Sequence, residues 1–195
     1  MPTPDRTSLP AIVAAGLHVL ETNGLSAVTM AAVAARVGVR PPSLYKRVRN
    51  RDALIRLIAE SVAADLGESL EAADPGGPGT PGADPHVRLS SIVRELRSFA
   101  CERPAAYRLI FTPLGTGDEV SPEVLESASV PLFDIVATLV DPDRVLLAAR
   151  TLTAWATGFI AMETSGAFRL GGDVDAAFEY GIESISAALT RPSSA

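Results

Sequence analysis

The chain has 195 residues and a formal net charge of −6, with 47% apolar and 21% charged residues. This composition is typical of a folded globular protein and excludes a disordered chain. A single cysteine excludes an internal disulfide and a zinc site built from several cysteines. The two histidines, His18 and His86, lie far apart in the sequence, so we expect no metal site and no cofactor.

The sequence favours a cytoplasmic protein. No basic and then apolar signal peptide opens it. The longest apolar stretch, around Trp155, is interrupted by Arg150 and Glu163, so we expect no segment to span a membrane.

Helical periodicity runs through most of the chain, and signals for strands are nearly absent. Apolar residues recur at steps of three and four, and glycines or prolines mark the ends of the periodic segments. The sequence therefore predicts an all-α fold of about nine helices, over residues 8–22, 29–37, 41–48, 50–66, 87–101, 104–111, 123–140, 142–167 and 173–189.

Polar residues at the starts of several segments are suited to capping helices. Thr29, Asn50 and Asp173 each precede an apolar-periodic stretch, where their side chains can accept hydrogen bonds from unpaired backbone N–H groups. Gly38 permits the left-handed turn that would close the helix begun at Thr29. Pro131 lies inside a helical segment, so it must kink that helix or begin a new one.

Eight of the twelve residues from 74 to 85 are proline or glycine, which predicts a flexible surface loop. We divide the chain into an N-terminal domain of residues 1–54 and a helical domain of residues 55–195 that contains this loop.

The positive charge of this acidic chain is gathered in one short window. Between Arg36 and Arg56 there are seven basic residues and one acidic residue, which makes the window +6 and leaves −12 for the rest. Five apolar residues in and before this window have the spacing of a small core between two short helices: Val33, Val37, Val39, Leu44 and Val48. Such a pair of helices is a helix-turn-helix, whose second helix fits a DNA major groove about 12 Å wide.

The polar residues around the second helix are suited to phosphates and bases. Thr29 and Tyr45 offer hydroxyl groups to backbone phosphates, and Arg40 and Ser43 are candidates for touching base edges. The residues assigned to DNA binding are Thr29, Arg40, Pro41, Ser43, Tyr45, Lys46, Arg47 and Arg51. The alternative is a helical protein-interaction module whose basic face meets an acidic partner without reading DNA sequence.

The segment VTMAAVAARVGVRPPSLYKRVRNRDAL, which follows a helix ending in ETNG, resembles the DNA-binding domain of the TetR family of transcriptional regulators. The resemblance implies phosphate contacts from Thr29, Tyr45, Lys46, Arg47 and Arg51. Many family members have a phenylalanine where this chain has Val48.

The rest of the chain resembles the family's helical effector-binding and dimerisation domain. RPAAYRLIFT and TGFIAMETSGAFRL are similar to segments of one large subgroup, P-x-x-Y-x-L-x-F and H-G-F-x-x-L-E-x-x-G-x-F, with Thr157 in place of the histidine. The resemblance implies a homodimer formed by the last two helices, and small residues there allow close helix packing. We assign the effector cavity to Phe99, Tyr107, Phe111, Trp155, Phe159 and Met162, although ordinary core packing explains the same spacing.

The expected function is a ligand-responsive DNA-binding regulator. The resemblance implies a repressor that a small molecule releases from its operator. We find no nucleophile motif, metal-ligand cluster or phosphate-binding glycine loop, so we do not expect an enzyme. Cys101 lies beside an apolar run, where a lone cysteine is more often inert than a redox sensor.

Overall fold

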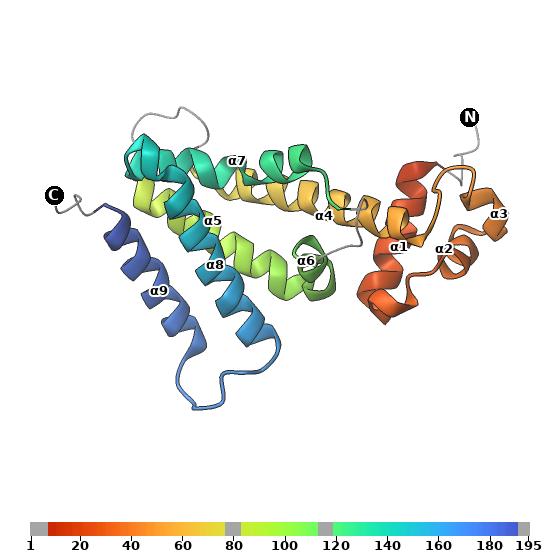
Figure 1. Cartoon of the computed structure of the whole chain (residues 1–195). Helices are drawn as coiled ribbons and strands as arrows, with labels where there is room; N and C mark the ends of the chain where they lie inside the picture. The colour runs from red at the N-terminus through yellow and green to blue at the C-terminus, as the bar shows by residue number, and fades with distance from the viewer. Residues whose placement is uncertain (1–7, 77–82, 113–118, 191–195) are drawn as a thin grey trace. The chain divides into compact units, whose positions relative to one another are not determined.

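The computed structural model describes residues 8–76, 83–112 and 119–190. These residues form nine α-helices and two short 3-10 helices, with no strand among them (Figure 1). The predicted all-α fold is therefore confirmed. The chain divides into two compact units, one of Met1–Asp65 with Arg103–Glu126 and one of Leu66–Glu102 with Ser127–Ala195. The predicted domain boundary after residue 54 stays a prediction.

The first unit is built around the start of a long helix, α4. Its elements are α1 (Leu9–Asn23), η1 (Leu25–Ala27), α2 (Met30–Val37), α3 (Pro41–Leu44), residues 51–65 of α4 (Arg51–Ala73), α6 (Pro104–Ile110) and the start of α7 (Pro122–Leu139). Ile12, Val33 and Leu54 are fully buried in its core. A Cβ at Gly16 would lie 2.6 Å from the Cδ1 atom of Ile58, so glycine is what allows α1 to pack this closely against α4.

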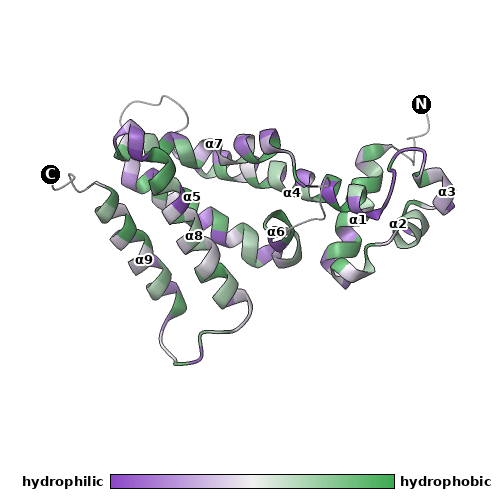
Figure 2. Ribbon diagram, in the orientation of Figure 1, coloured by the Kyte–Doolittle hydropathy of each residue, from purple (hydrophilic) through white to green (hydrophobic). Residues whose placement is uncertain are grey.

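The second unit packs the remaining parts of α4 and α7 with α5 (Pro85–Glu102), α8 (Val145–Thr164) and α9 (Val174–Leu189). Ile135, Leu152 and Phe178 are among its fully buried side chains. Helices α4 and α7 approach closely, since a Cβ at Gly67 would lie 2.9 Å from the Cα of Ala128. Figure 2 shows that apolar and polar residues alternate along these helices, as amphipathic packing requires.

Four predicted helix boundaries were wrong, including the end of the helix predicted over 142–167, which lies at Thr164. The helix predicted over 41–48 ends at Leu44, and a turn follows in which the N–H groups of Arg47 and Val48 both donate to the Leu44 carbonyl (2.8 and 2.9 Å). The helix predicted over 50–66 continues to residue 73. The helix predicted from residue 142 begins with a 3-10 turn, η2 (Pro142–Arg144), before α8. Of the two outcomes expected for Pro131, a new helix is excluded, since this proline lies inside α7.

The loop predicted over 74–85 lies partly outside the described residues, which omit 77–82. At its described start, Asp74 accepts hydrogen bonds from the Gly76 N–H (3.1 Å) and from the Arg88 guanidinium (2.6 and 2.8 Å). This ion pair is almost fully buried and ties the end of α4 to the first turn of α5.

One segment of the described chain, Pro142–Thr164, is long and apolar enough to cross a membrane by length and composition. The charges at Arg150 and Glu163 are too few to fail this test, and the expectation that no segment spans a membrane stays a prediction. The core helices of globular proteins pass the same test, yet only 28% of this apolar window is buried within the protein.

Candidate DNA interface and effector region

The helix-turn-helix is formed by α2 and α3, and local hydrogen bonds define its ends. Thr29 caps α2, with its Oγ1 accepting the Ala32 N–H at 3.1 Å. Gly38 ends α2 in the left-handed region at φ +80°, where its own N–H bonds to two carbonyls of the preceding turn. The capping oxygen of Thr29 acts as an acceptor here, so its O–H proton can still be donated to a phosphate.

A small hydrophobic core holds α3 against α2. Val33 and Leu44 are fully buried and Val48 is 2% exposed, whereas Val37 and Val39 are only half-buried. Leu44 thus anchors one side of α3, and the polar residues around it face solvent. The core predicted from the spacing exists, with its three inner members carrying most of the packing.

The residues predicted to bind DNA lie on or beside α3. Arg40 precedes the helix, Pro41 forms its first turn, and Ser43 is half-buried within it. Tyr45 is 54% exposed, and it begins the turn that follows α3. The other exposed residues of this predicted set are Thr29, Arg40, Pro41, Lys46 and Arg47.

Arg51 differs from the other members of the set, because its guanidinium is bound within the protein. Its Nε donates to the Val28 carbonyl at 2.7 Å, and its Nη2 donates to the Leu25 carbonyl at 2.8 Å. These bonds join the first turn of α4 to the segment just before the Thr29 cap. No pattern in the sequence indicates this contact, since its partners are backbone atoms more than twenty positions away.

The structure divides the six predicted effector residues between the two units. Tyr107 and Phe111 form a tilted pair in the first unit, with ring centroids 5.2 Å apart. The other four, which lie in the second unit, are Phe99, Trp155, Phe159 and Met162. Phe99 is buried there, whereas Met162 is 46% exposed. A shared cavity for all six stays a prediction.

Trp155 and Phe159 belong to an aromatic cluster within the second unit. Trp155 stacks on Phe178 with ring centroids 5.3 Å apart, and Phe159 contacts Phe178 edge-on at 5.1 Å. Phe159 also packs against Phe168 at 4.8 Å. These rings join α8 to α9 and to the segment between them, so their contacts also suit the core packing considered as the alternative.

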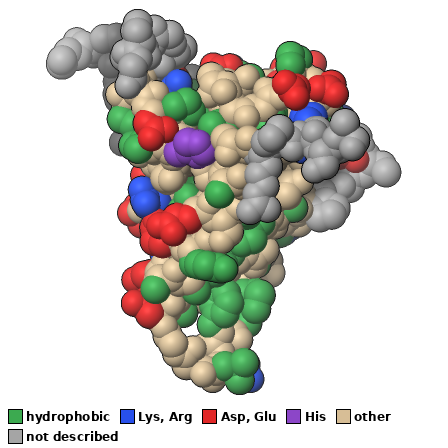
Figure 3. Space-filling view, turned by 90° about the vertical axis from the view of Figure 1, so that its left-hand side faces the viewer, with side chains coloured by type: hydrophobic (Ala, Val, Ile, Leu, Met, Phe, Trp, Pro, Cys, Tyr) green, Lys and Arg blue, Asp and Glu red, His purple; other side chains and the backbone are tan. Residues whose placement is uncertain are grey.

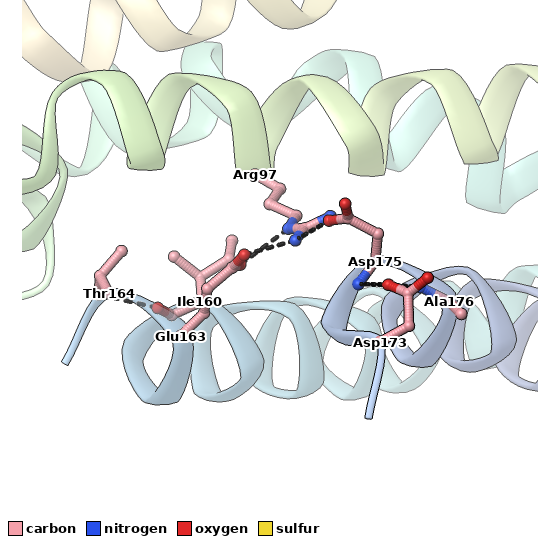
Figure 4. Close-up of polar contacts among 7 residues, drawn as sticks. All are labelled: Arg97, Ile160, Glu163, Thr164, Asp173, Asp175 and Ala176. Atoms are coloured by element: carbon pink, nitrogen blue, oxygen red, sulfur yellow. Dashed lines mark hydrogen bonds and ion pairs between the residues drawn. The ribbon is translucent and has the colours of Figure 1, made fainter. Parts of the chain in front are cut away.

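Arg97 links three helices beside this cluster, and the sequence did not single it out. Figure 4 shows its guanidinium between Glu163 of α8 and Asp175 of α9. It donates to both oxygens of Glu163, with Nε at 2.8 Å, and its Nη2 donates to Asp175 at 2.6 Å. Its carbon centre also lies 4.7 Å from the centroid of the Phe178 ring. Hydrogen bonding to Glu163 raises the pKa of Arg97 above its ordinary value.

A second arginine of α5 binds α9 one turn away. Arg94 donates to both carboxylate oxygens of Glu179, at 2.6 and 2.8 Å. This hydrogen bonding lowers the pKa of Glu179, which stays ionised at neutral pH. The contacts of Arg94 with Glu179 and of Arg97 with Asp175 together fix the position of α9 along α5.

Cys101 lies at the surface near the end of α5. Partial burial raises the pKa of its thiol, and the nearby Glu163 carboxylate raises it further. A raised pKa leaves little thiolate at neutral pH, which agrees with an inert cysteine.

Two family descriptions match the chain. Residues 12–58 match bacterial regulatory proteins of the tetR family, and residues 89–185 match the tetracyclin repressor-like C-terminal domain. The chain is also 26% identical over 191 residues to the Uncharacterized HTH-type transcriptional regulator Rv0681 of Mycobacterium tuberculosis. That match covers 96% of this chain and 84% of the relative.

Solved structures share the fold. A variant of TetR from Acinetobacter baumannii AYE, crystallised in complex with minocycline, is 22% identical with a TM-score of 0.67. The match covers 93% of this chain and 95% of that one. BioQ with its double-stranded DNA operator is 20% identical with a TM-score of 0.65, covering 94% of this chain and 98% of that one.

The helix-turn-helix at the N-terminal end and the helical region that follows define a DNA-binding regulator. The chain belongs to the TetR family of bacterial transcriptional regulators. Members of this family are non-enzymatic DNA-binding proteins, so the expectation that the chain is not an enzyme is confirmed. Its place in the subgroup with the H-G-F-x-x-L-E segment stays a prediction.

Proposed function

We propose that this regulator binds operator DNA through α3 and the residues around it, and that a small molecule releases it. The observation that carries the proposal is the exposure of polar residues around one anchored helix. Buried Leu44 fixes α3, while Tyr45, Lys46 and Arg47 lie at the surface. The local charge of +6 in an otherwise acidic chain favours phosphate binding on this side, and the −12 elsewhere disfavours it on other surfaces.

The proposed contacts have two different tasks. Thr29, Tyr45, Lys46 and Arg47 would bind backbone phosphates and position the protein, while Arg51 would support these contacts by holding the segment before α2. Arg40, Pro41 and Ser43 would face the base edges, where arginine pairs best with guanine. Positioning contacts act on every sequence alike, whereas base contacts discriminate among sequences.

This division of tasks can be tested on a set of operator variants. Tyr45→Phe and Lys46→Gln should weaken binding to all sequences by the same factor. Arg40→Ala and Ser43→Ala should alter the preference between bases by roughly 1–3 kcal/mol per lost contact. Binding titrations against each single-base variant of a selected operator give both quantities. Equal losses on every sequence for all four protein variants would contradict the assignment.

We also propose that the second unit forms the homodimer through the outward faces of α8 and α9. Leu147 of α8 is 63% exposed and Tyr180 of α9 is 73% exposed. Small exposed residues, including Ala154 and Gly158, lie on the same face of α8 as Leu147. Figure 3 shows hydrophobic side chains exposed on one face of this unit, down to the α8–α9 connection at the bottom of the view. Exposed apolar faces of this kind typically mark an interface.

A dimer also suits the DNA-binding task. One short helix contacts few base pairs, and two such helices can bind half-sites about 34–36 Å apart with a combined affinity far above that of one. An effector that favours a different arrangement of the dimer would shift the population away from the DNA-binding state. We also propose that the protein is cytoplasmic, because its operator DNA is found there.

The dimer interface is tested by placing a charge on the exposed face of α8. Ala154→Glu should give a protein that sediments as a monomer, because an unpaired carboxylate would be buried between subunits. The matched control is Ala64→Glu, which adds the same charge at an exposed alanine inside α4. The proposal requires that the control remain a dimer in analytical ultracentrifugation. If both variants keep the mass of the unmodified protein, this face is not the interface.

The effector site is proposed for the second unit, beside Phe99, Trp155, Phe159 and Met162. Tyr107 and Phe111 stay predictions of the sequence. The apolar character of the four residues favours a largely apolar or aromatic molecule. The A. baumannii relative supports the idea that this fold accepts such molecules, since its structure contains minocycline.

A further inference from the structure

An open groove in the first unit lies next to the proposed DNA interface. Its volume is about 480 Å³. The residues that line it are Leu9, Arg47, Val48, Arg49, Ala53, Arg56 and Leu57. They come from the start of α1, the turn between α3 and α4, and the first two turns of α4. The groove is therefore formed entirely within one compact unit.

Three guanidinium groups give the groove a positive charge. Arg47 and Arg49 are exposed, and Arg56 is half-buried on α4. Arg56 Nη1 donates to Glu60 Oε1 at 3.0 Å, so one carboxylate offsets part of this charge. The residues that line the groove include three arginines and no carboxylate.

The apolar lining residues have a different role from the arginines. Val48 and Ala53 are buried, so they hold the turn after α3 against α4 and form a rigid floor. Leu9 is 39% exposed and Leu57 is half-buried, which leaves an apolar wall beside the charged one. An arginine fork beside an apolar wall suits a phosphodiester, whose charged oxygens are joined to an apolar sugar face.

The groove is continuous with the proposed DNA interface because Arg47 belongs to both. We propose that it binds the DNA backbone next to the site that α3 occupies, with Arg49 and Arg56 as additional phosphate contacts. Neither residue was assigned to DNA binding from the sequence. The proposal rests on the proposed function, and it widens the DNA footprint from the helix-turn-helix to the second turn of α4.

The salt dependence of DNA binding tests this proposal. The number of phosphates a protein neutralises sets the slope of log affinity against log salt concentration, at about 0.9 per phosphate on duplex DNA. Arg49→Gln and Arg56→Gln in the full chain should each reduce the slope by about 0.9, with the same loss on every operator variant. Arg49→Lys and Arg56→Lys, which keep the charge, should retain the slope. Arg169→Gln changes an exposed arginine of the second unit and serves as the control with no expected change.

The outcomes separate this inference from the function on which it rests. If the unmodified protein binds no duplex DNA, or binds it without salt dependence, both proposals fail. If it binds DNA and Lys46→Gln lowers the slope while the Arg49 and Arg56 variants do not, only the groove proposal fails. The groove proposal also fails under a second pair of results. In these, inorganic phosphate or pyrophosphate at constant ionic strength raises the melting temperature of the unmodified protein but not of the Arg49 and Arg56 variants, and the variants keep the salt slope of DNA binding. The groove would then be a site for small anions.

Discussion

Gly181→Ala should destabilise the second unit by about 3 kcal/mol, because the added methyl group has no room. A Cβ at this position would overlap Cζ2 of Trp155 and lie 2.8 Å from its Cε2. These are atoms of a rigid ring, and the ring is itself stacked on Phe178, so it cannot move aside without losing that contact. The small gain in helix propensity from alanine, at most about 1 kcal/mol, does not offset the clash.

Urea unfolding measures this effect directly. Trp155 is the single tryptophan of the chain, so its fluorescence reports on the environment that the substitution disturbs. The control is the same substitution made in a Trp155→Phe protein, where the clashing ring is smaller. In that protein, Gly181→Ala should lower the free energy of unfolding by much less, as measured by circular dichroism. An equal penalty in both backgrounds would show that Trp155 is not its cause.

Arg51→Lys should weaken DNA binding by about tenfold or more, although the charge is kept. Two of the guanidinium nitrogens bind the carbonyls of Leu25 and Val28, and a lysine cannot reproduce this fork. Hydrogen bonds from a charged donor each contribute about 1.5–3 kcal/mol, and the partial exposure of Arg51 puts its bonds at the low end of that range. Losing them loosens the segment before Thr29, and so the start of α2 on which the DNA contacts depend.

Salt dependence also distinguishes the two possible roles of Arg51. If its guanidinium acts by positioning α2, Arg51→Lys lowers both the melting temperature and the affinity while the salt slope stays the same. If Arg51 acts mainly as a phosphate contact, as the family resemblance implies, the lysine variant keeps the stability and most of the affinity. Arg51→Gln should then lower the slope by about 0.9. We expect the first result, because the hydrogen bonds are already made in the absence of DNA.

Local signals in the sequence predicted the helix starts well. Thr29, Asn50 and Asp173 all cap helices, and in each case the capped N–H lies two or three residues further along the chain. Gly38 closes α2 as expected. The length of α3 could not be predicted in this way, because Leu44 and Val48 have helical spacing whether or not the helix continues between them. In the structure α3 ends at Leu44, and the N–H groups of Arg47 and Val48 both donate to the Leu44 carbonyl.

The effector region was harder to predict for a related reason. Aromatic residues at helical spacing predict burial, but the spacing does not say which rings meet. Trp155 and Phe159 both contact Phe178, which was not among the assigned residues, while Tyr107 and Phe111 belong to the other unit. Glu163 lies near these rings in the sequence, but its partner Arg97 lies 66 positions earlier in the chain.

The sequence by itself determined the helical fold, the caps, the helix-turn-helix and the basic window that marks the DNA-binding side. Each of these depends on residues a few positions apart, whose distances follow from helix geometry alone. Only the tertiary structure decided that Arg51 holds the segment before α2, that Arg97 joins α5 to α8 and α9, and that Gly181 makes room for Trp155. These contacts join residues that are distant in the sequence, and packing of the helices brings them together. The groove at Arg49 and Arg56 has the same origin, because the start of α1 forms one of its walls.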